Sequence, residues 1–209
     1  MLSITVWEID GKRMIYEAIK QKLQEAGVDF VDHKHEPIRT VQDALEKWPY
    51  GIDNLVKTVA FRLRDDRVVL AAALASARID YKKLASVLGI GRRDIASLSP
   101  AEVHERLQVE PGGVCPIPVS DEVRVIVDAP VGELQEVFCG FGRLDHTLQI
   151  SASELIRVGG GKWLKLASLE CVLNVLSLSH RFLKPPSVPL YSSDNLDRDA
   201  GYCRYLSAD

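Results

Sequence analysis

The chain has 209 residues, of which 46% are hydrophobic and 26% are charged, and its formal net charge is -3. This length and composition predict one globular domain, with or without a tail, that builds its core without disulfides or metals. The net charge excludes a protein that holds nucleic acid by its overall charge alone, although a local basic patch is compatible with it. Four scattered cysteines, and no apolar run near the ~20 residues of a bilayer span, predict a cytoplasmic protein without membrane association.

Periodicity and capping residues predict three helices and three strands in the first half of the chain. Two β-prone runs joined by a polar turn have the form of a hairpin. Thr40 and Asp80 each precede a helical stretch and are suited to its N-cap. The predicted helices span 13–26, 41–47 and 81–88, and the predicted strands span 28–33, 55–63 and 68–74.

The second half combines a shaped loop with further strands and helices. Ser99, Pro100 and Glu102 have the spacing of a capping box with proline in the first turn, and Ser151 begins another short helix. The stretch 111–118 is too rich in glycine and proline for regular structure. Strands are predicted over 123–127, 136–139 and 147–150.

The order of these elements predicts an α+β fold with a mixed, largely antiparallel sheet and surrounding short helices. Three glycines at 159–161 end the compact domain, which we assign to residues 13–160. Residues 161–209 form the predicted C-terminal extension, with a helix over 163–183 followed by a tail.

Several common catalytic motifs are missing or incomplete. Gly140-Phe141-Gly142 begins like a dinucleotide-binding loop, but it lacks the third glycine and a surrounding βαβ unit. His33 and His35 share a strand face, yet two imidazoles are too few for a catalytic metal. Cys115 has no base tied to it, which favours a small packed side chain over a nucleophile. We therefore predict neither a cofactor nor a metal site.

Two features remain that carry chemistry. Lys57 lies among the apolar residues of 55–61, so it either points to solvent from a strand, which the pattern alone favours, or is held over a cleft. The loop 112–118 contains adjacent glycines, whose amides approach a ligand closely and form an anion-binding concavity. A plain turn explains the composition of this loop equally well.

Taken in chain order, the motifs resemble the YbaK/ProX family, which is related to the editing domain inserted in bacterial prolyl-tRNA synthetases. The likeness covers residues 15–158, and it depends on the order and spacing of motifs that are weak individually. The motifs are His35-x-Pro37 with Thr40, Val56-Lys57-Thr58, Asp80 to Ala85, Ala96 to Val103, Pro111 to Pro116, Gly140-x-Gly142-Arg143, and Ser151 to Leu155.

The resemblance implies a free-standing aminoacyl-tRNA deacylase, which hydrolyses the ester of a mischarged small amino acid on proline tRNA. Its implied partners are aminoacyl-tRNA and prolyl-tRNA synthetase. Lys57 would be essential, and the backbone amides of Gly112, Gly113 and Val114 would stabilise the oxyanion, one such donor being worth about 3 kcal/mol. The implied substrate-binding residues are His35, Thr40, Phe61, Cys115, Pro116, Gly142, Asp145 and His146.

Two other functions remain open from the sequence. A family member that binds tRNA or a synthetase without hydrolysing anything would keep the same motifs. A small-molecule esterase is disfavoured, because the sequence has no G-x-S-x-G elbow. Five arginines would meet tRNA phosphates or form a solvated charged face, and they are Arg62, Arg64, Arg67, Arg92 and Arg93.

Overall fold

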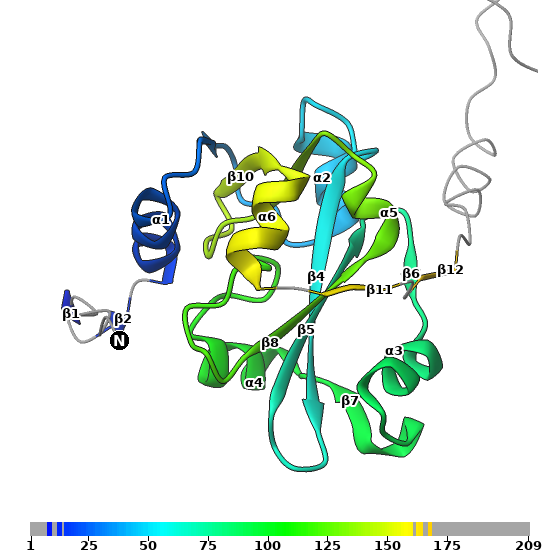
Figure 1. Cartoon of the computed structure of the whole chain (residues 1–209). Helices are drawn as coiled ribbons and strands as arrows, with labels where there is room; N and C mark the ends of the chain where they lie inside the picture. The colour runs from blue at the N-terminus through cyan, green and yellow to red at the C-terminus, as the bar shows by residue number, and fades with distance from the viewer. Residues whose placement is uncertain (1–7, 10–11, 14, 161, 165–166, 169–209) are drawn as a thin grey trace, which may run out of the picture. The chain divides into compact units, whose positions relative to one another are not determined.

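The computed structural model describes residues 8–9, 12–13, 15–160, 162–164 and 167–168. They all belong to one compact unit (Figure 1). None of the helices in the described part of the chain has the length and apolar character that a bilayer crossing requires.

Side-chain caps fix the starts of four helices in this unit. Thr40, Asp80, Ser99 and Ser151 each accept a hydrogen bond from an amide two or three residues further on, which satisfies donors that the helix itself leaves unpaired. The helices are α1 (Ile15–Glu25), α2 (Val41–Lys47), α3 (Tyr81–Leu88), the 3-10 helix η1 (Arg92–Asp94), α4 (Pro100–Leu107), α5 (Ala129–Gly132) and α6 (Ala152–Gly159).

An eight-stranded mixed sheet forms the centre of the fold. Seven strands follow the order β11-β8-β5-β4-β9-β10-β3, and β7 pairs with the far part of β4. Its strands are β3 (Phe30–Lys34), β4 (Leu55–Leu63), β5 (Val68–Leu74), β7 (Ile95–Ser97), β8 (Arg124–Asp128), β9 (Glu136–Gly140), β10 (His146–Ser151) and β11 (Lys162–Leu164). Two further ribbons pair β1 (Glu8–Ile9) with β2 (Lys12–Arg13), and β6 (Arg78–Ile79) with β12 (Ala167–Ser168).

Antiparallel pairings outnumber parallel ones in this sheet. β4 is antiparallel to β5 and β7, and β10 is antiparallel to both β9 and β3. Parallel pairs join β4 to β9, β5 to β8, and β8 to β11. The structure thus confirms the predicted α+β class with its mixed, largely antiparallel sheet.

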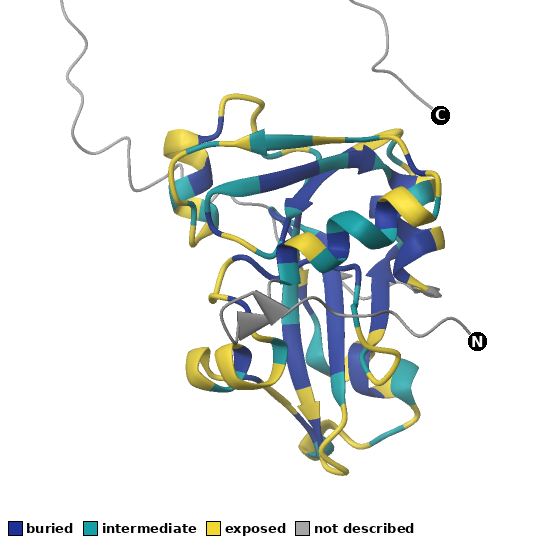
Figure 2. Ribbon diagram, turned by 90° about the vertical axis from the view of Figure 1, so that its left-hand side faces the viewer, coloured by how far each residue is buried: buried dark blue, intermediate teal, exposed yellow. Residues whose placement is uncertain are grey.

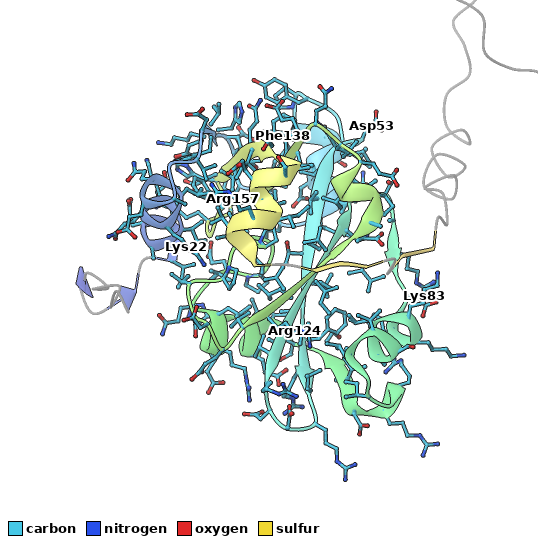
Figure 3. All side chains as sticks on the ribbon, viewed as in Figure 1. Lys22, Asp53, Lys83, Arg124, Phe138 and Arg157 are labelled. Atoms are coloured by element: carbon cyan, nitrogen blue, oxygen red, sulfur yellow. The ribbon has the colours of Figure 1, made fainter. Side chains whose placement is uncertain are left out.

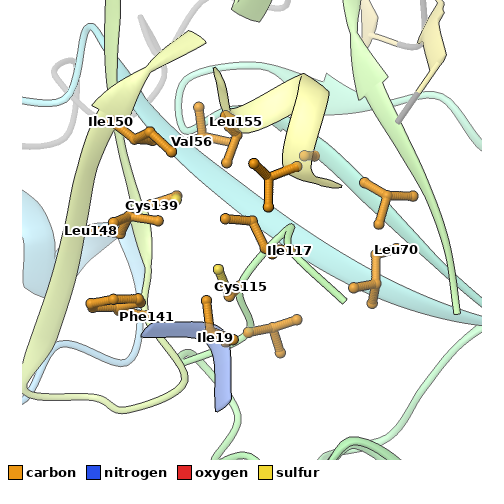
Figure 4. Close-up of a cluster of buried hydrophobic side chains, with 14 of the residues drawn as sticks. Ile19, Val56, Leu70, Cys115, Ile117, Cys139, Phe141, Leu148, Ile150 and Leu155 are labelled. Carbon is orange, nitrogen blue, oxygen red and sulfur yellow. The ribbon is translucent and has the colours of Figure 1, made fainter. Parts of the chain in front are cut away.

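The β4–β5 hairpin is buried on both faces, because each face carries its own hydrophobic core (Figure 2). On one face, Val56 and Leu70 pack in the cluster that α1 and α6 cover with Ile19 and Leu155 (Figure 4). On the other face, Phe61 packs in a cluster with residues of α3. Successive side chains of a strand point to opposite faces, so neighbouring residues of β4 serve different cores.

The predicted helix over 163–183 is wrong where the structure describes it. Residues 162–164 form β11, which runs parallel to β8 and extends the sheet beyond the predicted end of the domain at 160. Residues 167–168 form β12, paired with β6. The pairing partners lie far away in the sequence, so a local pattern carries no signal for these strands. The rest of the predicted helix and the tail lie outside the described residues.

Candidate active site

A pocket of about 320 Å³ opens between the start of α2, the start of β4, the glycine loop and the first residues of β10. Half of the residues that the sequence singles out for the site line this pocket, which we call the Lys57 pocket. They are His35, Thr40, Lys57, Gly112, Val114 and His146. The other lining residues are Ile38, Arg39, Val41, Ala44, Leu55, Val56, Thr58, Gly140, Arg143, Leu144 and Thr147.

Lys57 lies near the beginning of β4 and is half-buried. Its Nζ donates a hydrogen bond to the carbonyl oxygen of Ala75 at 3.0 Å. Burial lowers the pKa of the ammonium below its ordinary value, because low-dielectric surroundings disfavour the charged form. Lys57 is therefore held at the wall of a cleft, and it is not the freely solvated strand lysine that the pattern alone favours.

Close backbone contacts shape the glycine loop. Gly112 has a φ of +101°, and a Cβ atom at this residue would lie 2.6 Å from the carbonyl oxygen of Arg39. Both the conformation and the contact therefore require glycine. The loop is also tied to the turn before β10, because the amide of Gly142 donates to the carbonyl of Gly113 at 2.8 Å.

The amides of the loop differ in whether they are already engaged. The amide of Gly113 donates to the carbonyl of Glu110 at 2.9 Å, so it closes a turn inside the loop. This corrects its predicted role as an oxyanion donor. Within the described residues, the amides of Gly112 and Val114 donate to no backbone oxygen. The donors left for a substrate oxygen are therefore those two amides.

Three hydrogen bonds hold His35 in place. Its amide donates to the carbonyl of Asp145 at 2.9 Å, which ties the end of β3 to the start of β10. The ring Nδ1 lies 2.7 Å from the carbonyl oxygen of Glu36, and Nε2 lies 2.8 Å from the hydroxyl of Thr147. Because a carbonyl only accepts, we assign the proton to Nδ1, which leaves Nε2 to accept from the threonine. Thr40 lines the pocket beside it while capping α2, its hydroxyl accepting from the amide of Asp43 at 3.0 Å.

His146 is the end of a hydrogen-bonded chain of three side chains from three elements, and the other two support it. The Nδ1 atom of His146 lies 2.7 Å from Oδ1 of Asp32, and the hydroxyl of Tyr16 donates to the other carboxylate oxygen. A carboxylate accepts only, so we assign the imidazole proton to Nδ1. Since Nε2 has no hydrogen bond within the part of the chain that the structure describes, it is the ring atom left for a ligand.

Hydrogen bonds outweigh burial in setting the pKa of Asp32. Burial alone would raise the pKa of Asp32, but the hydrogen bonds from Tyr16 and His146 hold it below its ordinary value. Burial and the hydrogen bond to the carboxylate raise the pKa of Tyr16. Lys20 adds a positive charge, with its Nζ 3.8 Å from Asp32. The carboxylate therefore stays ionised and keeps the imidazole in one tautomer near neutral pH.

Asp145 acts on the pocket through Arg143. Its carboxylate binds the guanidinium of Arg143, with Nε at 2.8 Å and Nη2 at 3.0 Å. The hydrogen bond from Arg143 is the main reason that the pKa of Asp145 falls to about 2. Arg143 lines the pocket and Asp145 does not. The acid therefore positions the arginine beside the substrate space.

Four other predicted residues lie outside the lining of the Lys57 pocket. Phe61 is fully buried in the opposite core, where its ring meets Tyr81 edge-on at 5.0 Å. Cys115 and Pro116 are buried behind the loop, as the packing interpretation of Cys115 predicts. Gly142, with a φ of +81°, supports the loop through its amide. Cys115, Pro116 and Gly142 therefore belong to the glycine loop or to the turn tied to it, whereas Phe61 lies in the opposite core.

A second hollow of about 330 Å³ lies behind the glycine loop. Its lining includes Ile19, Leu70, Cys115 and Ile117, and it contains neither Lys57 nor a histidine. In residues 15–160 and the short strands around them, no group of three or more His, Cys, Asp or Glu side chains is placed to hold a metal ion. A third hollow of about 640 Å³ is lined by Lys57, Phe61 and Tyr81 together with Arg78, Asp80 and Arg92, so Lys57 borders two hollows. The Lys57 pocket differs from this third hollow in that its lining also contains the glycine loop and two histidines.

Sequence reasoning missed the two residues that support His146. Asp32 and Tyr16 are separated from His146 by more than a hundred residues in the chain. The pairing of β3 with β10 brings Asp32 to His146, and the packing of α1 brings Tyr16 to both. One signal was present in the strand itself. Asp32 shares a face with Phe30, so an acidic side chain stands on the apolar face of β3.

The arginines considered for tRNA phosphates lie at the other end of β4 or on neighbouring turns. At ~3.3 Å per residue, Leu63 is about 20 Å along the strand from Lys57. Arg62, Arg64 and Arg67 pair with Glu102, Asp94 and Asp65 at 3.6, 3.6 and 2.6 Å. Arg92 lies over the ring of Tyr81 at 4.7 Å. These four arginines already have partners within the domain.

Comparison with known proteins shows the family of this domain. The family model described as "Aminoacyl-tRNA editing domain" matches residues 35–158, which contain the glycine loop and all the lining residues of the Lys57 pocket. The chain belongs to the aminoacyl-tRNA editing domain family.

Among individual proteins, the uncharacterised protein YwhH of Bacillus subtilis (strain 168) is 33% identical over 116 residues, which are 56% of this chain and 72% of YwhH. A proline–tRNA ligase of Lactiplantibacillus plantarum is 26% identical over 109 residues, which are 52% of this chain and only 19% of the ligase. A crystal structure described as a candidate trans-editing enzyme for prolyl-tRNA synthetase superposes with a TM-score of 0.62 at 19% identity. It covers 73% of this chain and 96% of that one, and at this identity the likeness concerns the fold.

Proposed function

We propose that this chain is a free-standing deacylase, which hydrolyses the ester between a mischarged small amino acid and the terminal ribose of proline tRNA. One observation carries the proposal. A half-buried lysine, two available loop amides and an oriented histidine converge on a single pocket, in a domain of the aminoacyl-tRNA editing family. The similarity to part of a proline–tRNA ligase supports proline tRNA as the substrate.

The walls of the pocket favour a small amino acid. Its volume of about 320 Å³ is near the lower end of ligand pockets, and the ribose occupies part of this space. More than half of the lining side chains are apolar or short. The apolar lining comes from Ile38, Val41, Ala44, Leu55, Val56, Val114 and Leu144.

The reaction requires stabilisation of one negative charge. Attack of water on the ester carbonyl gives a tetrahedral oxyanion, and its collapse breaks the bond to the ribose oxygen, which leaves as a hydroxyl after taking a proton. The ammonium of Lys57 and the amides of Gly112 and Val114 are the groups available to bind the oxyanion. Preorganised donors of this kind are worth about 3 kcal/mol each, because they need no reorganisation during the reaction.

His146 supplies an acceptor for the attacking water. Its Nδ1 proton is held by Asp32, so Nε2 presents a lone pair to the pocket. A water molecule that donates to Nε2 is oriented for attack, and the ring accepts its proton as the bond forms. The substrate ester is already activated, so these groups suffice without a protein nucleophile.

Release of amino acids from a panel of mischarged tRNAs tests this function. We expect one or a few small amino acids to be released, and Lys57→Ala to lower kcat by about 10²- to 10³-fold. Lys82→Ala, an exposed lysine of α3, is the matched control and should keep wild-type turnover. Cleavage of no ester, or equal rates for Lys57→Ala and wild type, would overturn the catalytic assignment. Binding of tRNA without release would then favour the noncatalytic module.

A further inference from the structure

Five aromatic rings gather beside the Lys57 pocket, where α2 ends and β3 and β9 pass. Phe138 is labelled near this end of the domain in Figure 3. Trp48 lies 5.4 Å from His35, 5.6 Å from His33, 5.1 Å from Tyr50 and 5.3 Å from Phe138, measured between ring centroids. We call His33, His35, Trp48, Tyr50 and Phe138 the aromatic cluster.

The cluster has a buried base and one exposed ring. Trp48 and Phe138 are 6% and 5% exposed, whereas Tyr50 is 56% exposed. The ring of Tyr50 is stacked on Phe138, with an interplanar angle of 13° and a centroid separation of 5.4 Å. The tyrosine ring is thus held nearly parallel to Phe138 and also meets His33 and Trp48 at 5.2 and 5.1 Å, while more than half of the residue stays in water.

The exposed ring is connected directly to the pocket. His35 lines the Lys57 pocket and meets Trp48, which in turn meets Tyr50. Ala44 and Leu55 also belong both to the pocket lining and to the apolar base under the rings. The pocket and the exposed ring are therefore only two ring contacts apart, through His35 and Trp48.

We propose that the exposed face of Tyr50 is a stacking site for the terminal adenine of the aminoacyl-tRNA, and this inference rests on the function proposed above. The scissile ester is attached to the ribose of that nucleotide, so its base lies one sugar ring away from the pocket. Aromatic side chains bind nucleobases by stacking, and a ring already fixed by its neighbours loses little conformational freedom on binding.

Packing alone does not explain the position of Tyr50. Burial from water is what makes an aromatic ring stabilising in a fold, and more than half of this ring stays in water. A tyrosine that served only as a core residue would be buried like Phe138.

Kinetics with two substrates test the stacking site. One substrate is the aminoacyl-tRNA that wild type cleaves best, and the other carries the same amino acid on a ribose without a base. For Tyr50→Ala, we expect the rise in KM with the tRNA to exceed the rise with the base-free ester by about ten-fold. Tyr50→Phe keeps the ring and should restore most of the affinity. Leu45→Ala, an exposed apolar residue of α2 outside the pocket lining, is the control and should match wild type.

The outcomes separate this inference from the proposed function. If Tyr50→Ala weakens both substrates equally or neither, the stacking site is refuted while the deacylase stands. If wild type cleaves no ester, a titration of uncharged tRNA with and without its terminal adenosine still tests the inference. We then expect wild type to bind the truncated tRNA about ten-fold more weakly, and Tyr50→Ala to lose that difference. Equal binding of both tRNAs by wild type would overturn the proposal.

Discussion

Two polar networks of this domain differ in burial, one beside the Lys57 pocket and one at the tip of the β4–β5 hairpin. In the first, the side chains of His146 and Asp32 are 14% and 19% exposed. In the second, Arg67 and Asp65 pair at 2.6 Å with 64% and 53% of their side chains exposed. Water screens the exposed pair, whereas the shielded network holds its groups in one orientation. Short distances alone therefore do not distinguish a functional network from a solvated one.

A substitution in the glycine loop should have the largest effect on turnover, because it changes the Lys57 pocket and not the hairpin tip. Gly112→Ala should lower kcat by about 10²-fold, because its Cβ atom meets the backbone of Arg39 and moves the amides away from the oxyanion. Gly89→Ala is the matched control, since Gly89 also has a positive φ but would meet nothing within 4 Å. We expect both variants to lower the melting temperature, and only the first to lower single-turnover hydrolysis. Equal turnover in the two variants would remove the loop from the mechanism.

The buried network gives the next largest effect. Asp32→Asn should lower kcat by about ten-fold and alter the pH profile, because an amide group facing Nδ1 lets the imidazole proton move to Nε2. Tyr16→Phe removes one hydrogen bond to the carboxylate while keeping the ring, so we expect it to lower kcat less than Asp32→Asn does. Steady-state rates measured from pH 5 to 9 check both expectations. A pH profile for Asp32→Asn that matches wild type would contradict this role of Asp32.

The same carboxylate makes stability depend on pH in a defined direction. Folding lowers the pKa of Asp32. The ionised carboxylate therefore contributes to the free energy of unfolding above its ordinary pKa of about 3.9, and this contribution is lost as the pH falls through the pKa of the folded state. The difference in melting temperature between wild type and Asp32→Asn should accordingly be largest near neutral pH and shrink in acid. A difference in melting temperature that grew on acidification would contradict a lowered pKa of Asp32 in the folded protein.

The exposed pair should give the smallest effect. Arg67→Ala removes the partner of Asp65 at the hairpin tip, and we expect no measurable change in turnover or in melting temperature. Repeating the melt at high salt sharpens the comparison, because screening should leave this variant and wild type indistinguishable. A loss of tRNA affinity in this variant would instead assign the hairpin tip to the tRNA.

Most of the fold could be predicted because its signals are local. Thr40, Asp80 and Ser99 mark helix starts by their own side chains, and the polar turn between β4 and β5 predicts their hairpin. The strand β11 could not be predicted, because it is defined by its parallel pairing with β8, which is distant in the sequence. Local sequence cannot encode such a partner.

The site shows the same division. Lys57 and the glycine loop stand out in short motifs, whereas Asp32 meets His146 across 114 residues of chain. The resemblance implied Phe61 as a substrate-binding residue, but its side chain is buried in the core packed against α3, outside the lining of the Lys57 pocket. Motifs therefore identify groups with chemistry, and strand pairing decides which of them meet.

The Tyr16–Asp32–His146 chain has a consequence for the extent of the functional unit. Residues 35–158 match the family model, and they contain His146 but neither Asp32 nor Tyr16. A fragment cut to the matched region would keep the lysine and the loop while leaving the imidazole without its anchor. The smallest fragment that keeps the anchored imidazole therefore begins with α1, and a graft of this domain into another protein should carry that helix along.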